Sequence, residues 1–135
     1  MAVKAGALPI HRGEELCGDV PDIPVYQHAL SRIPNVTGVV AVHANNPTID
    51  KNLIALSKKM VDIGVPETMT CYPMTHFNDY HRQHNRIYGS IRAMTIERIR
   101  NYKDPYHPNP DVLLVDTSIE IETPESYAKC LKQAS

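Results

Sequence analysis

The sequence predicts a small α/β domain, a three-layer sandwich around a mostly parallel sheet of three to four strands. Two observations carry this prediction. Short valine-rich runs at residues 37–44 and 112–115 are typical of buried strands. These runs alternate with stretches of helical periodicity, and such alternation indicates parallel βαβ units. The length of 135 residues fits a single domain.

The N-terminal region is expected to be irregular. Glycine and proline interrupt any periodicity over residues 1–23, which we interpret as an arm preceding a domain at residues 24–135. A short helix is predicted over residues 24–33, because Pro24 suits a first helical turn and Pro34 ends the pattern. The first valine-rich strand follows this helix.

Residues 48–63 show the clearest helical pattern in the chain. Thr48 can cap the start of this helix, and Gly64 stands at the natural stop position. The next segment, residues 67–72, alternates polar and apolar side chains and is predicted to be a strand. The apolar stripe of the helix steps by four and three residues through Ile49, Leu53, Leu56, Met60 and Ile63.

The middle of the chain allows two folds. A polar helix is expected from Thr75 to about Tyr88. Residues 91–102 fit either a helix or a strand, and we favour the helix. The alternative is that residues 86–99 form a strand, which predicts a ferredoxin-like α+β sheet instead.

The C-terminal third contains a loop, a strand and a helix. Prolines exclude regular structure over residues 104–110, and the strand at residues 112–115 follows. Thr123, Pro124 and Glu125 form a strong helix start. A sheet of so few strands leaves its edges open, so we expect a homo-oligomer that covers them.

Composition narrows the function classes. The net charge of −1 and a pI of about 6.6 argue against a nucleic-acid binder. Three cysteines without CxxC spacing favour a reducing compartment, so we expect a cytoplasmic protein. No apolar run reaches the length of a membrane span, so we expect no membrane contact. Acidic residues interrupt a group of arginines, which favours a solvated helix face for Arg82, Arg86, Arg92, Arg98 and Arg100.

Polar residues follow each predicted strand. Ligands of parallel α/β sheets bind beyond the carboxyl ends of the strands, so we expect these residues to converge on one pocket. No apolar core requires such groups at three strand ends. The residues are His43, Asn45 and Asn46 after the first strand, Cys71, Tyr72, Thr75 and His76 after the second, and Asp116, Thr117 and Ser118 after the third.

These groups predict acid–base chemistry on a small polar, anionic metabolite. His43 and His76 are the candidate proton carriers, Asp116 orients a histidine, and Tyr72 acts as an acid or donor. No GxGxxG or GxxxxGK[ST] motif is present, so we expect a cofactor-free lyase or isomerase rather than a redox enzyme. The candidate substrate-binding residues are Asn45, Asn46, Thr75, Ser118, Arg82 and Arg86.

Two other hypotheses stay open at this stage. His81 and His84 lie three residues apart and could share a divalent metal, although no HExxH motif or obvious third ligand accompanies them. The chain could also be a non-catalytic subunit of a larger complex. The proline-rich arm at residues 1–23 and the loop at residues 104–110 would then dock the partner.

Overall fold

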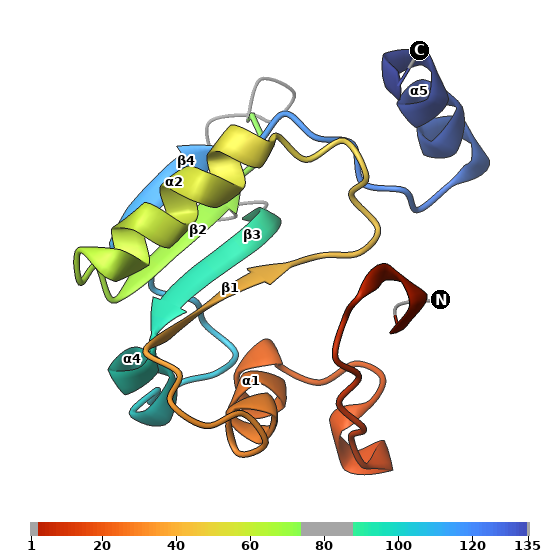
Figure 1. The fold of residues 1–135 in the computed structure, drawn as a ribbon. Coiled ribbons are helices and arrows are strands. Elements are labelled where there is room, and N and C mark those ends of the chain that lie inside the picture. Colours follow the sequence, from red (N-terminus) through yellow and green to blue (C-terminus); the bar gives the residue numbers. More distant parts are fainter. Residues whose placement is uncertain (1–2, 74–87, 135) are drawn as a thin grey trace.

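The computed structural model describes residues 3–73 and 88–134, which contain one four-stranded sheet and several helices (Figure 1). The strands are β1 (Gly38–Val42), β2 (Glu67–Cys71), β3 (Tyr88–Thr95) and β4 (Val112–Val115). The α-helices are α1 (Asp22–Leu30), α2 (Lys51–Asp62), α4 (Ile96–Arg100) and α5 (Pro124–Ala134), and two 3₁₀ turns, η1 (Val3–Ala5) and η2 (Glu14–Leu16), lie in the N-terminal region. Helices α1, α2 and α4 lie beside the sheet, while α5 lies apart from it (Figure 1).

The sheet is mixed, with most neighbouring strands antiparallel. Its order is β1-β3-β2-β4, in which β3 runs antiparallel to both β1 and β2, and β4 runs parallel to β2. The prediction of a mostly parallel sheet is therefore wrong, and the alternative α+β class fits. The unit β1–α2–β2–β3 is a split βαβ arrangement, because β3 lies between two strands that share one direction.

The inserted strand is the segment for which the sequence allowed two structures. We favoured a helix over residues 91–102, but residues 88–95 form β3 and only the five residues of α4 are helical. Hydrogen bonding on both sides decides the outcome, since β3 pairs with β1 and with β2. Thr95 ends the strand and caps α4, because its hydroxyl accepts a hydrogen bond from the Arg98 amide at 3.3 Å.

The other elements predicted within the described residues are confirmed to within a few residues, and the helix expected from Thr75 to about Tyr88 lies almost entirely outside them. Helix α2 has the expected position, but Asp50 caps it in place of Thr48, with its side chain accepting from the Asn52 amide at 2.8 Å. Gly64 ends the helix with φ of +93°, a left-handed conformation that suits glycine. Within the described part of the chain, no helix is both long and apolar enough to cross a bilayer.

The core forms on both faces of the sheet. Helix α2 covers one face, where a side chain at Gly38 would collide with Val61. The next residue, Val39, points to the other face and packs against a buried cluster that joins α1, β3 and α4. That cluster consists of Ile23, Met94 and Ile99. Helices α1 and α4 thus lie at the end of the sheet where β3 ends and β1 begins (Figure 1).

Candidate functional site

Three strands end at the same edge of the sheet. Because β3 is antiparallel to both β1 and β2, those two strands share a direction, and β4 is parallel to β2. Their carboxyl ends therefore meet, although the sheet as a whole is not parallel. We call this the strand-end edge. The sequence predicted a pocket at this place. The strand ends meet there because β1, β2 and β4 run in the same direction.

Asn46 links the three strand ends. Its side chain is 3% exposed, and its Nδ2 donates to the Tyr72 hydroxyl at 2.7 Å and to the Ser118 Oγ at 3.2 Å. Its Oδ1 is buried and has no hydrogen-bond partner among the residues described. Buried polar atoms in native proteins are nearly always partnered, and an orphan acceptor costs about 1–3 kcal/mol. Asn46 Oδ1 can therefore accept a hydrogen bond from a donor that is not among the described residues.

Tyr72 offers the hydroxyl of this group. Burial raises the pKa of Tyr72 above its ordinary value, the Asn46 hydrogen bond opposes this, and the negative charges of Glu120 and Asp116 raise the pKa further. The phenol therefore keeps its proton at neutral pH. Its oxygen accepts from Asn46, so the hydroxyl proton can be donated to a bound molecule.

Asp116 anchors the strand-end edge from within. Asp116 is 1% exposed. Its Oδ2 accepts hydrogen bonds from the Ser90 amide at 2.7 Å and from the Ser90 hydroxyl at 2.5 Å. The same oxygen accepts from the Thr70 hydroxyl at 3.3 Å. Its Oδ1 accepts from the Ser118 amide at 2.8 Å. Burial acts to raise the pKa of Asp116, but the hydrogen bonds from Ser118 and Ser90 outweigh it and hold the pKa below its ordinary value. An ionised carboxylate with four donors positions its neighbours, and it contacts no histidine among the described residues.

Gly89 allows Asp116 to approach so closely. A Cβ at Gly89 would lie 2.5 Å from both Asp116 Oδ2 and Thr70 Oγ1. We expect Gly89→Ala to lower the free energy of unfolding by about 2 kcal/mol, because overpacking forces a buried carboxylate away from its donors. Urea denaturation of the full chain measures this loss.

Gly13→Ala is the matched control for that change. Gly13 has an ordinary φ of −67°, and the added Cβ would meet only the Glu15 side chain, whose flexible end can move into solvent. We expect the control to stay within about 0.5 kcal/mol of wild type. Equal unfolding midpoints for Gly89→Ala and wild type would contradict the close packing of Asp116.

The segment after β1 is held against the segment after β4. His43 continues the sheet, since its amide donates to the Ser90 carbonyl at 2.9 Å, while its side chain is exposed at the strand-end edge. Asn45 Nδ2 donates to Glu120 Oε1 at 3.0 Å, and the Asn45 carbonyl accepts from the Ile121 amide at 2.9 Å. Asn45 thus holds the two segments together, whereas the imidazole of His43 is accessible to solvent.

Several predicted site residues lie outside the described residues. Residues 74–87 contain Thr75, His76, Arg82 and Arg86, and also the proposed metal pair His81 and His84. Within residues 3–73 and 88–134, no group of three histidine, cysteine, aspartate or glutamate side chains could hold a metal ion. The structure brings Asn46, Tyr72, Asp116 and Ser118 together, with His43 at the same edge.

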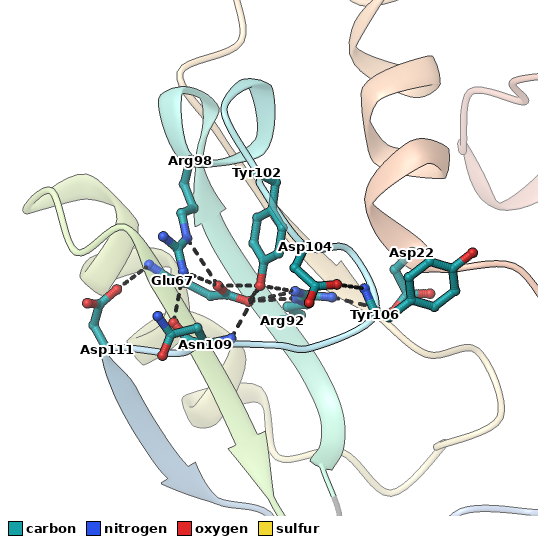
Figure 2. Close-up of polar contacts among 9 residues, drawn as sticks. All are labelled: Asp22, Glu67, Arg92, Arg98, Tyr102, Asp104, Tyr106, Asn109 and Asp111. Carbon is teal, nitrogen blue, oxygen red and sulfur yellow. Dashed lines mark hydrogen bonds and ion pairs between the residues drawn. The ribbon is translucent and has the colours of Figure 1, made fainter.

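A second polar cluster lies at the opposite end of β2. Glu67 is fully buried. Its Oε1 accepts hydrogen bonds from Arg92 Nε at 2.9 Å and Arg92 Nη2 at 2.7 Å (Figure 2). Its Oε2 accepts from Arg98 Nε at 3.2 Å and Arg98 Nη2 at 3.1 Å. Tyr102 donates to the same carboxylate at 2.9 Å. Both guanidinium groups also lie over the Tyr102 ring, 5.3 and 4.9 Å from its centre. The expected solvated helix face is therefore wrong for Arg92 and Arg98.

This cluster fastens the loop after α4 to the sheet. Arg98 Nη2 donates to the Asn109 carbonyl at 2.9 Å, and the Glu67 amide donates to Asp111 Oδ2 at 3.1 Å (Figure 2). Every oxygen of the Glu67 carboxylate is occupied by protein donors. We interpret the cluster as structural. The signal that could have revealed it is a charged residue within the alternation of each strand, Glu67 in β2 and Arg92 in β3.

Ser90 and Thr70 are the partners of Asp116 that sequence reasoning missed. Both stand within strands, and Ser90 lies between the two segments for which we favoured helices. Comparison of the chain with protein-family models gives no match, and comparison with curated protein sequences gives no significant match. A functional assignment for this chain therefore rests on the geometry of the strand-end edge.

Proposed function

We propose that the strand-end edge binds a small polar metabolite and that the chain converts it by acid–base chemistry, as a lyase or isomerase. The supporting observation is the Asn46 group, in which side chains from three strand ends meet beside a buried acceptor that has no partner among the described residues. The exposed imidazole of His43 at the same edge supports a proton-transfer role. The anionic character of the metabolite rests on the sequence alone, on Arg82 and Arg86.

The described residues suggest a division of tasks. His43 takes a proton from a carbon next to a substrate carbonyl, and the electron pair of that C–H bond moves to the carbonyl oxygen. Tyr72 donates a hydrogen bond to this oxygen as its negative charge develops. Asn46 and Ser118 orient the polar substrate, and Asp116 keeps the edge in position through Ser90 and Ser118. Return of the proton to a different carbon completes an isomerisation, and loss of a leaving group completes an elimination.

Proton exchange tests this proposal without knowledge of the natural product. The full chain is incubated in D₂O with pyruvate, 2-oxobutyrate and acetoacetate, and loss of the C–H signal is followed by ¹H NMR. We expect enzyme-dependent exchange on at least one probe and a fall of about 100-fold or more in His43→Gln, the usual effect of removing a general base. Tyr72→Phe is expected to slow the exchange as well.

His107→Gln is the matched control. His107 is exposed and hydrogen-bonded to Asp104 at 2.7 Å, in the loop that the Glu67 cluster fastens. Its exchange rate should equal that of wild type, and circular dichroism should show that all three variants are folded. Exchange in folded His43→Gln within a few-fold of wild type would disprove the role of His43. No exchange on any of the three probes would count against this reaction class.

A further inference from the structure

Three cavities meet around the C-terminal end of α1, away from the strand-end edge. One of them, of about 400 Å³, lies between the end of α1 and α4 and is lined by Arg32 and Arg100. A second of similar volume extends from Arg32 to the N-terminal arm, and a third of about 210 Å³ shares Arg100. Arg32 lines both the first and the second cavity, and Arg100 lines both the first and the third. We call these three neighbouring cavities the α1 groove.

The charged side chains that line the α1 groove are basic. None of the three cavities is lined by an aspartate or glutamate of the described chain. Neither Arg32 nor Arg100 forms an ion pair within residues 3–73 and 88–134. Arg92 and Arg98, by contrast, are both bonded to Glu67. Two guanidinium groups that line one concave surface without a carboxylate suit an anion, and phosphate matches their planar donor geometry.

The groove is shaped by the local backbone. Helix α1 ends at Leu30, and the chain then turns through Pro34 and Asn35, whose φ of +59° has the sign that the second central residue of a type II turn requires. The N-terminal arm is held beside α1 by a hydrogen bond of 2.9 Å between His28 Nε2 and the His11 carbonyl. This contact places Leu8, Pro9 and Ile10 along the second cavity, and these apolar residues give the groove an apolar extension beside its cationic part.

We propose that the α1 groove binds a soluble phosphate monoester that carries a small apolar body. Arg32 and Arg100 hold the phosphate, and the apolar body lies against Leu8, Pro9 and Ile10. The groove lies where β1 begins and β3 ends, whereas the strand-end edge lies where β1 ends. The five residues of β1 separate the two places by roughly 16 Å. The site is therefore separate from the one proposed for catalysis.

Isothermal titration of the full chain with inorganic phosphate and phenyl phosphate tests the site. We expect saturable binding of both, with phenyl phosphate tighter because its ring contacts the apolar part of the groove. Arg32→Ala and Arg100→Ala should each weaken binding about tenfold, the effect of losing one hydrogen-bonded charge partner. Leu8→Ala should weaken phenyl phosphate and leave inorganic phosphate unchanged.

Arg12→Ala is the matched control, because Arg12 is an exposed arginine of the same arm and lines none of the three cavities. It should bind both probes within twofold of wild type. Absence of saturable binding would overturn the proposal, and so would an equal loss in Arg12→Ala, which would indicate bulk charge alone. Loss of phosphate binding in Tyr72→Phe would place the anion at the strand-end edge instead. Binding to phosphatidic acid vesicles without binding of phenyl phosphate would replace the soluble ligand by a lipid headgroup.

Discussion

Replacement of Glu67 by glutamine is expected to lower the free energy of unfolding by about 3–5 kcal/mol, the usual result of removing one partner from a buried ion pair. Glu67 is fully buried, and Arg92 is 5% exposed. Glutamine keeps one acceptor oxygen but no charge. Among the described residues, the charge of Arg92 is then opposed only by Asp22, whose Oδ2 lies 3.9 Å from Nη1. Arg98 is more exposed and can regain water, so most of the loss arises at Arg92. Urea denaturation with a shared m-value measures the effect.

An exposed ion pair provides the control for this loss. Lys58 and Asp62 lie one turn apart on α2 at 2.6 Å, and both are largely exposed. Asp62→Asn removes a carboxylate of the same kind and should cost less than about 1 kcal/mol. The double variant Glu67→Gln with Arg92→Met should lose less than the sum of the single changes, because it leaves no uncompensated charge in the interior. A loss below 1 kcal/mol in Glu67→Gln would show that the cluster is not structural.

The Glu67 cluster also shows where sequence reasoning ends. A charged residue within a polar alternation is usually solvated, and Arg92 and Arg98 were interpreted in that way. The burial of Arg92 follows from the position of β3, which pairs on both sides and is covered by α1, α4 and the loop after α4. Those contacts join residues that are distant in the chain. Local patterns show a charged residue within each strand, but they do not show that these residues meet.

Segments with one dominant periodicity were predictable. Helix α2 and the strands β1 and β4 were predicted because each segment has one unambiguous pattern. Their burial was not predicted correctly. Leu56 and Ile63 of the α2 stripe are 38% and 67% exposed. Strands β1 and β4 are the two outer strands of the sheet, and Val42 and Val115 at their ends are 43% and 62% exposed. Residues 91–96 fit two periods, so pairing across the sheet decided between them. The direction of β3 could not be predicted either, because it depends on how the chain returns from β2.

The convergence of polar residues at the strand-end edge was predicted from parallel strands, and that argument holds although the sheet is mixed. Insertion of an antiparallel strand between β1 and β2 leaves those two strands parallel to each other. The contacts of Asn46 with Tyr72 and Ser118 therefore join residues that sequence reasoning placed at strand ends. What it could not anticipate is how Asp116 is used. Three of the four donors to its carboxylate come from β2 and β3, and the fourth is the Ser118 amide, which follows β4.

Replacement of Asp116 by asparagine is expected to cost on the order of 3 kcal/mol at neutral pH, since hydrogen bonds to a charged group contribute about 1.5–3 kcal/mol each and several are lost or inverted. An asparagine can accept through only one oxygen, so its amide group would face either the two Ser90 donors or the Ser118 amide. The variant loses the link between the ends of β2, β3 and β4. Urea denaturation measures the loss, and hydrogen exchange at the Ser90 amide locates it.

The same variant should change how stability depends on pH. The pKa of Asp116 is lower in the folded chain than its ordinary value, so the folded state favours the ionised form. The stability that this carboxylate contributes is fully present above the unfolded pKa of about 3.9 and is lost as pH falls through the lower folded pKa. Asp116→Asn should therefore flatten the acid side of the stability profile below about pH 4.

Asp104 distinguishes a buried carboxylate from an exposed one in this experiment. The His107 hydrogen bond lowers the pKa of Asp104 as well, but that side chain lies in solvent, where screening weakens the interaction. Asp104→Asn should leave both the neutral stability and the acid slope close to wild type. If Asp104→Asn and Asp116→Asn flatten the acid limb equally, the hydrogen bonds of Asp116 do not hold the three strand ends together, and its placement as the anchor of the strand-end edge is wrong.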